Sequence, residues 1–135
     1  MVPEFSSCIV CEGVREEARG KLTILGFFGI APNVDVRVQH LDQPTGLCFI
    51  ALGSPGEGKF TASFDVVDTS DGRKIAETPA GAFVASPENR TMAVLTAPLL
   101  FGRESTYALR FFLDGELKLE AKFNVRAANR ANVGG

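Results

Sequence analysis

Apolar and polar residues alternate with a period of two through the last third of the chain. Side chains in a β-strand point in turn to opposite faces, so such a run buries one face and exposes the other. The pattern predicts two antiparallel strands joined by a turn at Asp114-Gly115. Their apolar positions are Tyr107, Leu109, Phe111, Leu113, Leu117, Leu119, Ala121, Phe123 and Val125.

The register of this hairpin depends on the length of its turn. A two-residue turn with regular pairing places Phe111 opposite Lys118, an apolar side chain against a charged one on the same face. A three-residue loop over residues 113–115 places Phe111 opposite Leu117 and supplies Gly115 for the left-handed position. We therefore predict the three-residue loop.

Shorter segments with the same character precede the hairpin, and polar segments rich in glycine and proline separate them. They predict strands at 8–14, 21–28, 34–38, 47–52, 60–66, 74–77, near Phe83 and at 92–96. The first two segments could form a hairpin, and Pro98 places the last one at a sheet edge or strand end.

The sequence thus predicts an all-β domain over residues 1–126. The expected fold is a single immunoglobulin-like sandwich of two antiparallel sheets with about eight strands. Residues 127–135 have no apolar pattern and are expected to form a disordered tail.

Composition and charge restrict the classes of partner. The net charge is only −2 and no basic run occurs, which argues against a nucleic-acid partner. No apolar run approaches the roughly 18 residues of a membrane helix, and the first residues lack the features of a signal peptide. We therefore expect a cytoplasmic protein, without membrane association, whose three cysteines are reduced thiols.

The segment from Cys11 to Phe28, CEGVREEARGKLTILGFF, resembles the opening of a family of small uncharacterised bacterial β-sandwich proteins, catalogued as a domain of unknown function. The closing features of that family correspond here to Tyr107, Asp114-Gly115 and residues 116–125. The resemblance covers most of residues 8–126 in layout. It implies a cytoplasmic immunoglobulin-like sandwich and supplies no activity, ligand or catalytic residue. A tyrosine that leads the penultimate strand is also similar to the tyrosine corner of such folds.

Two groups of residues are similar to catalytic or redox motifs. Cys8 and Cys11 have the spacing of zinc and redox motifs, but residues three apart in a strand point to opposite faces. We interpret them as buried structural thiols. His40 is the only histidine, and Ser54 lies in a glycine-rich loop without a Gly-x-Ser-x-Gly elbow. The sequence therefore predicts no catalysis.

A third group, Asp65, Asp68 and Asp71 with Glu77 nearby, is similar to the loop carboxylates that bind calcium on some sandwiches. Asp65 should point outward in mid-strand, and the other two aspartates flank an ordinary turn. We interpret them as solvated turn acids and predict no metal and no cofactor.

The most interesting polar group is the charged segment between the first two strands, which contains Arg15, Glu16, Glu17, Arg19 and Lys21. It is either a solvated hairpin tip, since exposed ion pairs contribute only about 0–1 kcal/mol, or a recognition patch on a rigid scaffold. Phe112 stands on the polar face of the final hairpin, where it is either covered or part of a contact surface.

These observations predict a non-catalytic binding module that interacts with an unidentified protein or with a second copy of itself. Edge strands that can pair between chains make a homodimer plausible. The alternative is a small-molecule or carbohydrate-binding sandwich, in which Tyr107 and a few phenylalanines would be the exposed aromatics.

Overall fold

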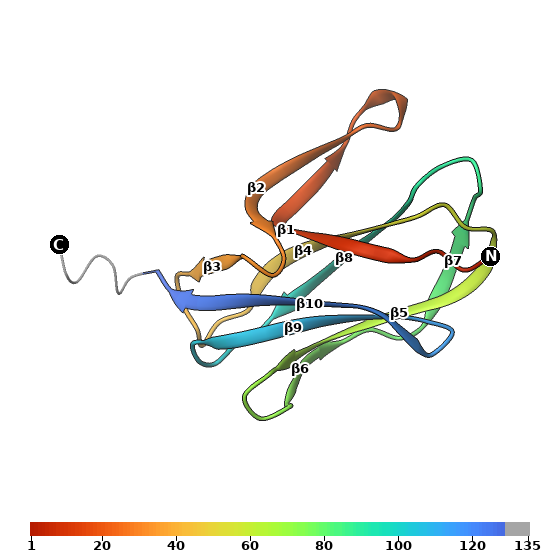
Figure 1. Cartoon of the computed structure of the whole chain (residues 1–135). Coiled ribbons are helices and arrows are strands. Elements are labelled where there is room, and N and C mark those ends of the chain that lie inside the picture. Colours follow the sequence, from red (N-terminus) through yellow and green to blue (C-terminus); the bar gives the residue numbers. More distant parts are fainter. Residues whose placement is uncertain (129–135) are drawn as a thin grey trace.

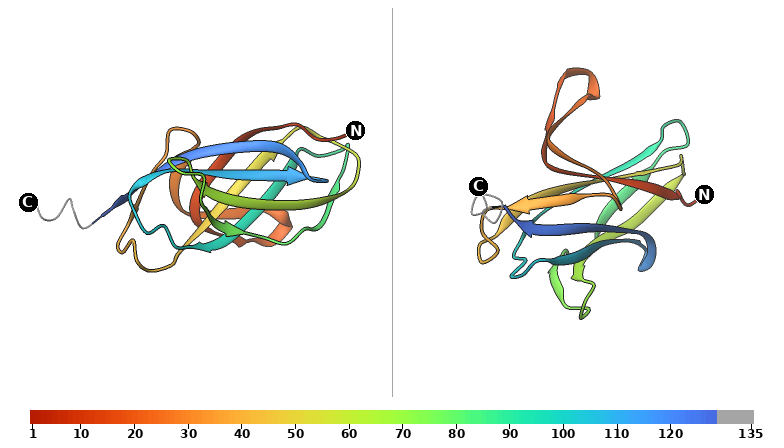
Figure 2. Two further views of the ribbon diagram at one scale, coloured as in Figure 1. Left: turned by 90° about the horizontal axis from the view of Figure 1, so that it is seen from below. Right: turned by 60° about the vertical axis from the view of Figure 1, so that its left-hand side comes forward.

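The computed structural model describes residues 1–128 and contains two packed β-sheets (Figures 1 and 2). The strands are β1 (Phe5–Glu16), β2 (Leu22–Ile30), β3 (Asp35–Val38), β4 (Thr45–Gly53), β5 (Gly58–Asp68), β6 (Lys74–Glu77), β7 (Gly81–Ala85), β8 (Thr91–Leu99), β9 (Ser105–Leu113) and β10 (Glu116–Ala127). A short 3-10 turn, η1 (Ala18–Gly20), joins β1 to β2. The all-β prediction is confirmed, with ten strands in these residues rather than about eight.

One sheet has four strands in the order β2-β1-β4-β8. The other has six, in the order β3-β10-β9-β5-β6, with β7 also paired to β5. The predicted antiparallel pairing holds with one correction, because β3 runs parallel to β10. Pro98 lies on β8, which forms an edge of the four-stranded sheet, as its missing N–H donor requires.

The core lies between the two sheets and consists mainly of phenylalanine, leucine and valine. Tyr107, at the start of β9, is fully buried and packs edge-on against Phe101. Its hydroxyl lies 2.9 Å from the carbonyl oxygen of Phe101 and 2.8 Å from that of Arg103. This is the hydrogen bonding of a tyrosine corner. Tyr107 is therefore part of the scaffold, and the expectation that it serves as an exposed aromatic is wrong.

The final hairpin has a two-residue turn, so the predicted three-residue loop is wrong. Asp114 and Gly115 have φ angles of 51° and 77°, and a type I′ turn requires positive φ at both central residues. Lys118 is an extra, bulged residue of β10, so Phe111 pairs with Leu119. The bulge removes the conflict between an apolar and a charged side chain without lengthening the turn.

Residue 127, predicted to be the first residue of the tail, belongs to a strand. Ala127 is the last residue of β10 and pairs with Val38, and its N–H donates to Glu104 Oε2 at 2.9 Å. The rest of the tail, from residue 129 onward, lies outside the described residues, so its predicted disorder stays a prediction.

Strand β1 extends beyond the sheet to which it belongs. It pairs with β4 only from Phe5 to Cys11, whereas its pairing with β2 continues to Glu16. Residues 12–26, which we call the arm, therefore form a two-stranded ribbon that projects from the sandwich (Figures 1 and 2). The expected hairpin between the first two strands is confirmed.

Candidate functional site

The outer face of the four-stranded sheet, which points away from the core, is apolar. In register, Ile30 of β2 lies beside Ile9 of β1, Ile9 beside Ile50 of β4, and Ile50 beside Val94 of β8. Register partners in a sheet share a face, so these four side chains form one row across all four strands. The two neighbouring sets are Phe27, Cys11, Cys48 and Thr96, and then Ser7, Leu52 and Met92.

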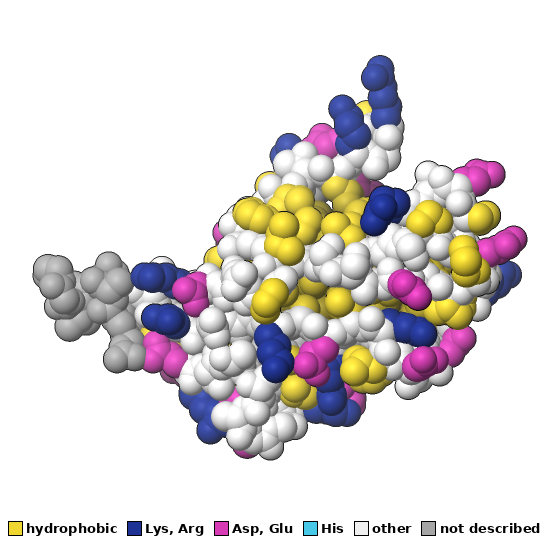
Figure 3. All heavy atoms as spheres, viewed as in Figure 1, with side chains coloured by type: hydrophobic (Ala, Val, Ile, Leu, Met, Phe, Trp, Pro, Cys, Tyr) yellow, Lys and Arg dark blue, Asp and Glu magenta, His cyan; other side chains and the backbone are white. Residues whose placement is uncertain are grey.

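This surface, which we call the apolar face, has a buried floor and an exposed rim. Cys11 and Cys48 are fully buried and Ile50 is only 2% exposed, although they lie outside the main core. The side chains around them remain open to solvent, with Phe27 59%, Ile30 53%, Met92 46% and Val94 39% exposed. None of the three sets contains a charged residue. Figure 3 shows hydrophobic side chains gathered over β1 and β2, below the charged tip.

The arm rises beside the apolar face. Val14, near its base, packs against the cluster of Cys11, Cys48 and Ile50. Farther out, Ile24 is 39% and Leu25 44% exposed. A two-stranded ribbon is at best marginally stable in water without a surface to pack on. The arm therefore presents apolar side chains that the sandwich itself leaves largely uncovered.

The structure brings five of the six predicted site residues together at the tip of the arm. Arg15 forms an ion pair with Glu17, and Thr23 Oγ1 donates to Glu17 Oε1 at 3.1 Å. Arg19 has a φ of 67°, so the tip is a tight left-handed turn. Within the described residues Arg19 and Lys21 make no ion pair, and Glu16 is exposed.

Phe112, the sixth predicted residue, lies on the other sheet and is not part of this surface. It is half-buried in β9, and the guanidinium carbon of Arg110 lies 5.8 Å from its ring centroid. This is cation–π geometry, which covers one side of the ring.

Sequence reasoning missed the apolar face. A signal was present in β2, whose nine residues include no charge and no proline. Residues 47–52 were expected to be buried on both faces, and this is confirmed except at Leu52, which is half-buried. The sequence did not show which strands lie beside this segment and share its outer face.

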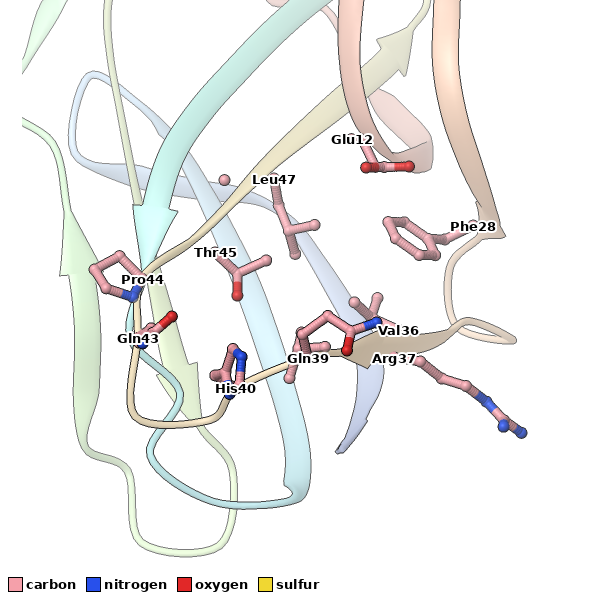
Figure 4. A pocket seen from close by; sticks show the side chains of 12 residues that line it. Glu12, Phe28, Val36, Arg37, Gln39, His40, Gln43, Pro44, Thr45 and Leu47 are labelled. Carbon is pink, nitrogen blue, oxygen red and sulfur yellow. The ribbon is translucent and has the colours of Figure 1, made fainter. Parts of the chain in front are cut away.

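A polar cleft of about 390 Å³ opens on the other side of the arm's base. Figure 4 shows the Glu12 carboxylate at one side of the cleft and Gln39, His40 and Thr45 around it, over apolar side chains of Phe28, Val36 and Leu47. Gly26, with a φ of 61°, lies against the side chain of Glu12, and a Cβ at this position would overlap the Glu12 carboxylate. The polar groups of the cleft could hydrogen-bond a small polar ligand.

The cysteines have the structural role that the sequence predicts. All three are buried and free of disulfides. Cys8 belongs to the main core, whereas Cys11 lies on the apolar face, so their thiols point to opposite sides of the sheet. Burial raises the pKa of Cys8 and of Cys48 to about 12, so both thiols stay protonated at neutral pH.

Asp65 and Asp68 are not solvated acids, and that expectation is corrected for both, whereas Asp71 is an exposed turn residue as expected. Asp65 accepts hydrogen bonds from Nε and one terminal nitrogen of Arg110, both at 2.7 Å, and is 5% exposed. Asp68 is fully buried and accepts from Ser70, Ser105 and Arg103. Burial alone would raise its pKa, but these hydrogen bonds outweigh burial and hold the pKa of Asp68 well below its usual range. Both carboxylates are satisfied by the protein itself.

Two packed sheets and the tyrosine corner define the class of this protein, an immunoglobulin-like β-sandwich. Within that class, the chain belongs to the family of unknown function DUF6941, whose family model matches residues 6–126. The predicted resemblance to a family of unknown function is confirmed at this level. The family assignment brings no activity, ligand or partner.

Among solved structures, the chain is similar to an immunoglobulin-like protein from Pseudomonas aeruginosa. The two share 17% identity, the alignment covers 90% of this chain and 97% of that one, and the TM-score is 0.43. No curated protein matches the chain. Within residues 1–128, no helix is long and apolar enough to cross a bilayer.

Proposed function

We propose that this protein is a non-catalytic interaction module that binds another protein through the apolar face and the arm. The observation that supports the proposal most is the row Ile30, Ile9, Ile50 and Val94, an uncharged apolar row on the outside of the sandwich. Exposed apolar patches of this kind, when bordered by polar residues, mark protein interaction sites. The charged tip provides that border on one side.

The two parts of the surface have different roles in this proposal. Burial of Phe27, Ile30 and Val94 supplies most of the binding free energy, since apolar area removed from water contributes about 25 cal/mol per Å². The charged residues of the tip orient the partner and raise the association rate, because rim charges act on encounter more than on affinity. This proposal retains the predicted recognition residues, which are Arg15, Glu16, Glu17, Arg19 and Lys21. It assigns most of the binding free energy to the neighbouring apolar face.

The test is a binding experiment with one lysine substituted on each sheet. Val94→Lys places a charge in the apolar row, whereas Val84→Lys alters an equally apolar and more exposed residue of β7, in the other sheet. Proteins retained by the purified chain, including further copies of it, are identified, and the affinity for each is measured. We expect Val94→Lys to abolish binding and Val84→Lys to leave it unchanged. Binding that survives Val94→Lys would refute the assignment of the surface.

The polar cleft supports a second candidate function, binding of a small polar molecule such as a saccharide. It is supported by the polar groups of Glu12, Gln39 and His40 around an apolar floor. A ligand should raise the melting temperature of the wild-type chain and should do so less for Glu12→Gln and His40→Ala. A panel of saccharides and metabolites that shifts none of the three proteins would exclude this candidate.

A further inference from the structure

Two surfaces of this one chain lack cover, and they lie next to each other. The first is the apolar face, with its rim of Phe27, Ile30, Met92 and Val94. The second is the arm: within residues 1–128, no further strand pairs with β1 beyond Cys11 or with the free edge of β2. One partner that covers both at once would remove the main exposed apolar area of the four-stranded sheet from water.

The edge strand β2 lacks the charges and prolines that keep many sheet edges apart in monomeric proteins, although one bulge interrupts its pairing with β1 between Val10 and Cys11. Such edges commonly carry an inward-pointing charge, a lysine or a proline. The nine residues of β2, LTILGFFGI, include none of these, and four of them are large apolar residues that remain exposed. An edge of this composition is expected to be covered in the functional assembly.

Charge is distributed unequally between the two ends of the same sheet. The tip of the arm, beyond one end, carries three basic and two acidic residues, a net charge of +1, and its Arg19 and Lys21 make no ion pair within residues 1–128. Around the other end, the loops that precede β1, follow β4 and precede β8 carry the exposed carboxylates of Glu4, Glu57 and Glu88. Arg90 and the ammonium group of Met1, which donates to the carbonyl oxygen of Glu57, are the basic groups at this end. The chain thus carries opposite charges at opposite ends of one apolar surface.

We infer that the partner of this surface is a second copy of the same chain, with the arm of each copy lying over the apolar face of the other. The inference rests on the proposed function. A two-fold axis makes such a contact isologous, so each copy supplies one arm and one face. The antiparallel arrangement sets the basic tip of one arm beside the acidic loops of the other copy. Apolar area is buried at the centre and opposite charges meet at both ends.

The first experiment measures molar mass by light scattering after size exclusion, over a range of protein concentrations. The wild-type chain should have about twice the 14.4 kDa of one chain. Val94→Lys should weaken the dimer at least tenfold, which corresponds to about 1.4 kcal/mol, and Val84→Lys should not. A wild-type chain that stays monomeric up to about 0.1 mM would overturn the inference, because a stable dimer has a far lower dissociation constant.

A second pair of variants tests the arrangement and does not alter the apolar face. Arg19→Glu with Lys21→Glu should weaken the dimer, and adding Glu57→Lys with Glu88→Lys should restore it, since the charges would again be opposite across the interface. Thermal melting of each variant confirms that it is folded. A dimer insensitive to all four changes would show that the tip does not meet these loops and would overturn the proposed arrangement.

The outcomes separate this inference from the proposed function. A monomeric chain that binds a different protein, with binding lost on Val94→Lys, would retain the proposed function and refute the second copy as partner. A monomeric chain whose binding is insensitive to Val94→Lys would refute both.

Discussion

The two sheets have opposite outer surfaces, although both are built from strands of the same alternating kind. Across the six-stranded sheet, the register sets Glu77, Asp65, Arg110 and Glu120 in one row. Across the four-stranded sheet, the corresponding row is Ile30, Ile9, Ile50 and Val94. Both rows cross four strands. In the first, Arg110 forms an ion pair with Asp65 and Glu77 forms one with Lys74, whereas the second leaves apolar side chains exposed to water.

This difference lies in whether the outer side chains have partners within the chain. Arg110 binds Asp65 through two hydrogen bonds, and Phe112 lies beside the same guanidinium. Phe112, the apolar residue on the polar face of the final hairpin, is therefore covered on one side by Arg110. Most of the exposed large apolar side chains lie on the other sheet, from which the arm also projects.

The largest expected effects compare neighbours on β4 that face opposite sides. Phe49 points into the core and Ile50 points to the apolar face, and both are almost fully buried. Phe49→Ala should lower the free energy of unfolding by about 4 kcal/mol and Ile50→Ala by about 3 kcal/mol, because each leaves a cavity. Chemical denaturation measures both. A loss under about 1 kcal/mol for Ile50→Ala would show that the apolar face is not a packed layer.

The next effect concerns the aspartates that anchor the six-stranded sheet. Arg103 binds both Asp68, which is fully buried, and Asp71, which is largely exposed, at 2.7 Å in each case. Asp68→Ala should destabilise the protein by about 3 kcal/mol, because it leaves buried donors without an acceptor. Asp71→Ala is the matched control and should cost less than about 1 kcal/mol. Equal losses would contradict the assigned role of burial.

The depressed pKa of Asp68 predicts acid sensitivity. Its carboxyl has a lower pKa in the folded chain than in the unfolded chain, so the unfolded state binds the proton first as the pH falls. The contribution of Asp68 to stability is therefore present above about pH 4 and declines below it. Denaturation midpoints measured from about pH 6 downward should fall less steeply for Asp68→Asn than for the wild type. Parallel curves would contradict this.

The smallest effects are expected at the thiols and at the tip. With their pKa raised to about 12, Cys8 and Cys48 should react with a thiol reagent at neutral pH only after unfolding. Rapid reaction of the native protein would show that the structure opens at Cys8 or Cys48.

Arg15→Ala should change the free energy of unfolding by less than about 1 kcal/mol, because its ion pair with Glu17 is exposed.

Several features of this fold follow from the sequence by itself. Alternation over residues 106–125 determined the final hairpin, because a period of two fits a half-buried strand and no helix. The same reasoning located the other strands, and the position of Tyr107 at the start of the penultimate strand indicated the tyrosine corner. The charged tip was also predictable, since polar residues between two β-rich segments form a turn.

Tertiary structure decided the rest, because those features depend on which strands become neighbours. The bulge at Lys118 corrects a register that local patterning cannot resolve, and the pairing of β5 with β9 turns Asp65 from a surface acid into the partner of Arg110. The apolar face exists only because four segments, distant in sequence, align Ile30, Ile9, Ile50 and Val94. Each of these residues looks ordinary in its own strand, and only their shared register makes a surface.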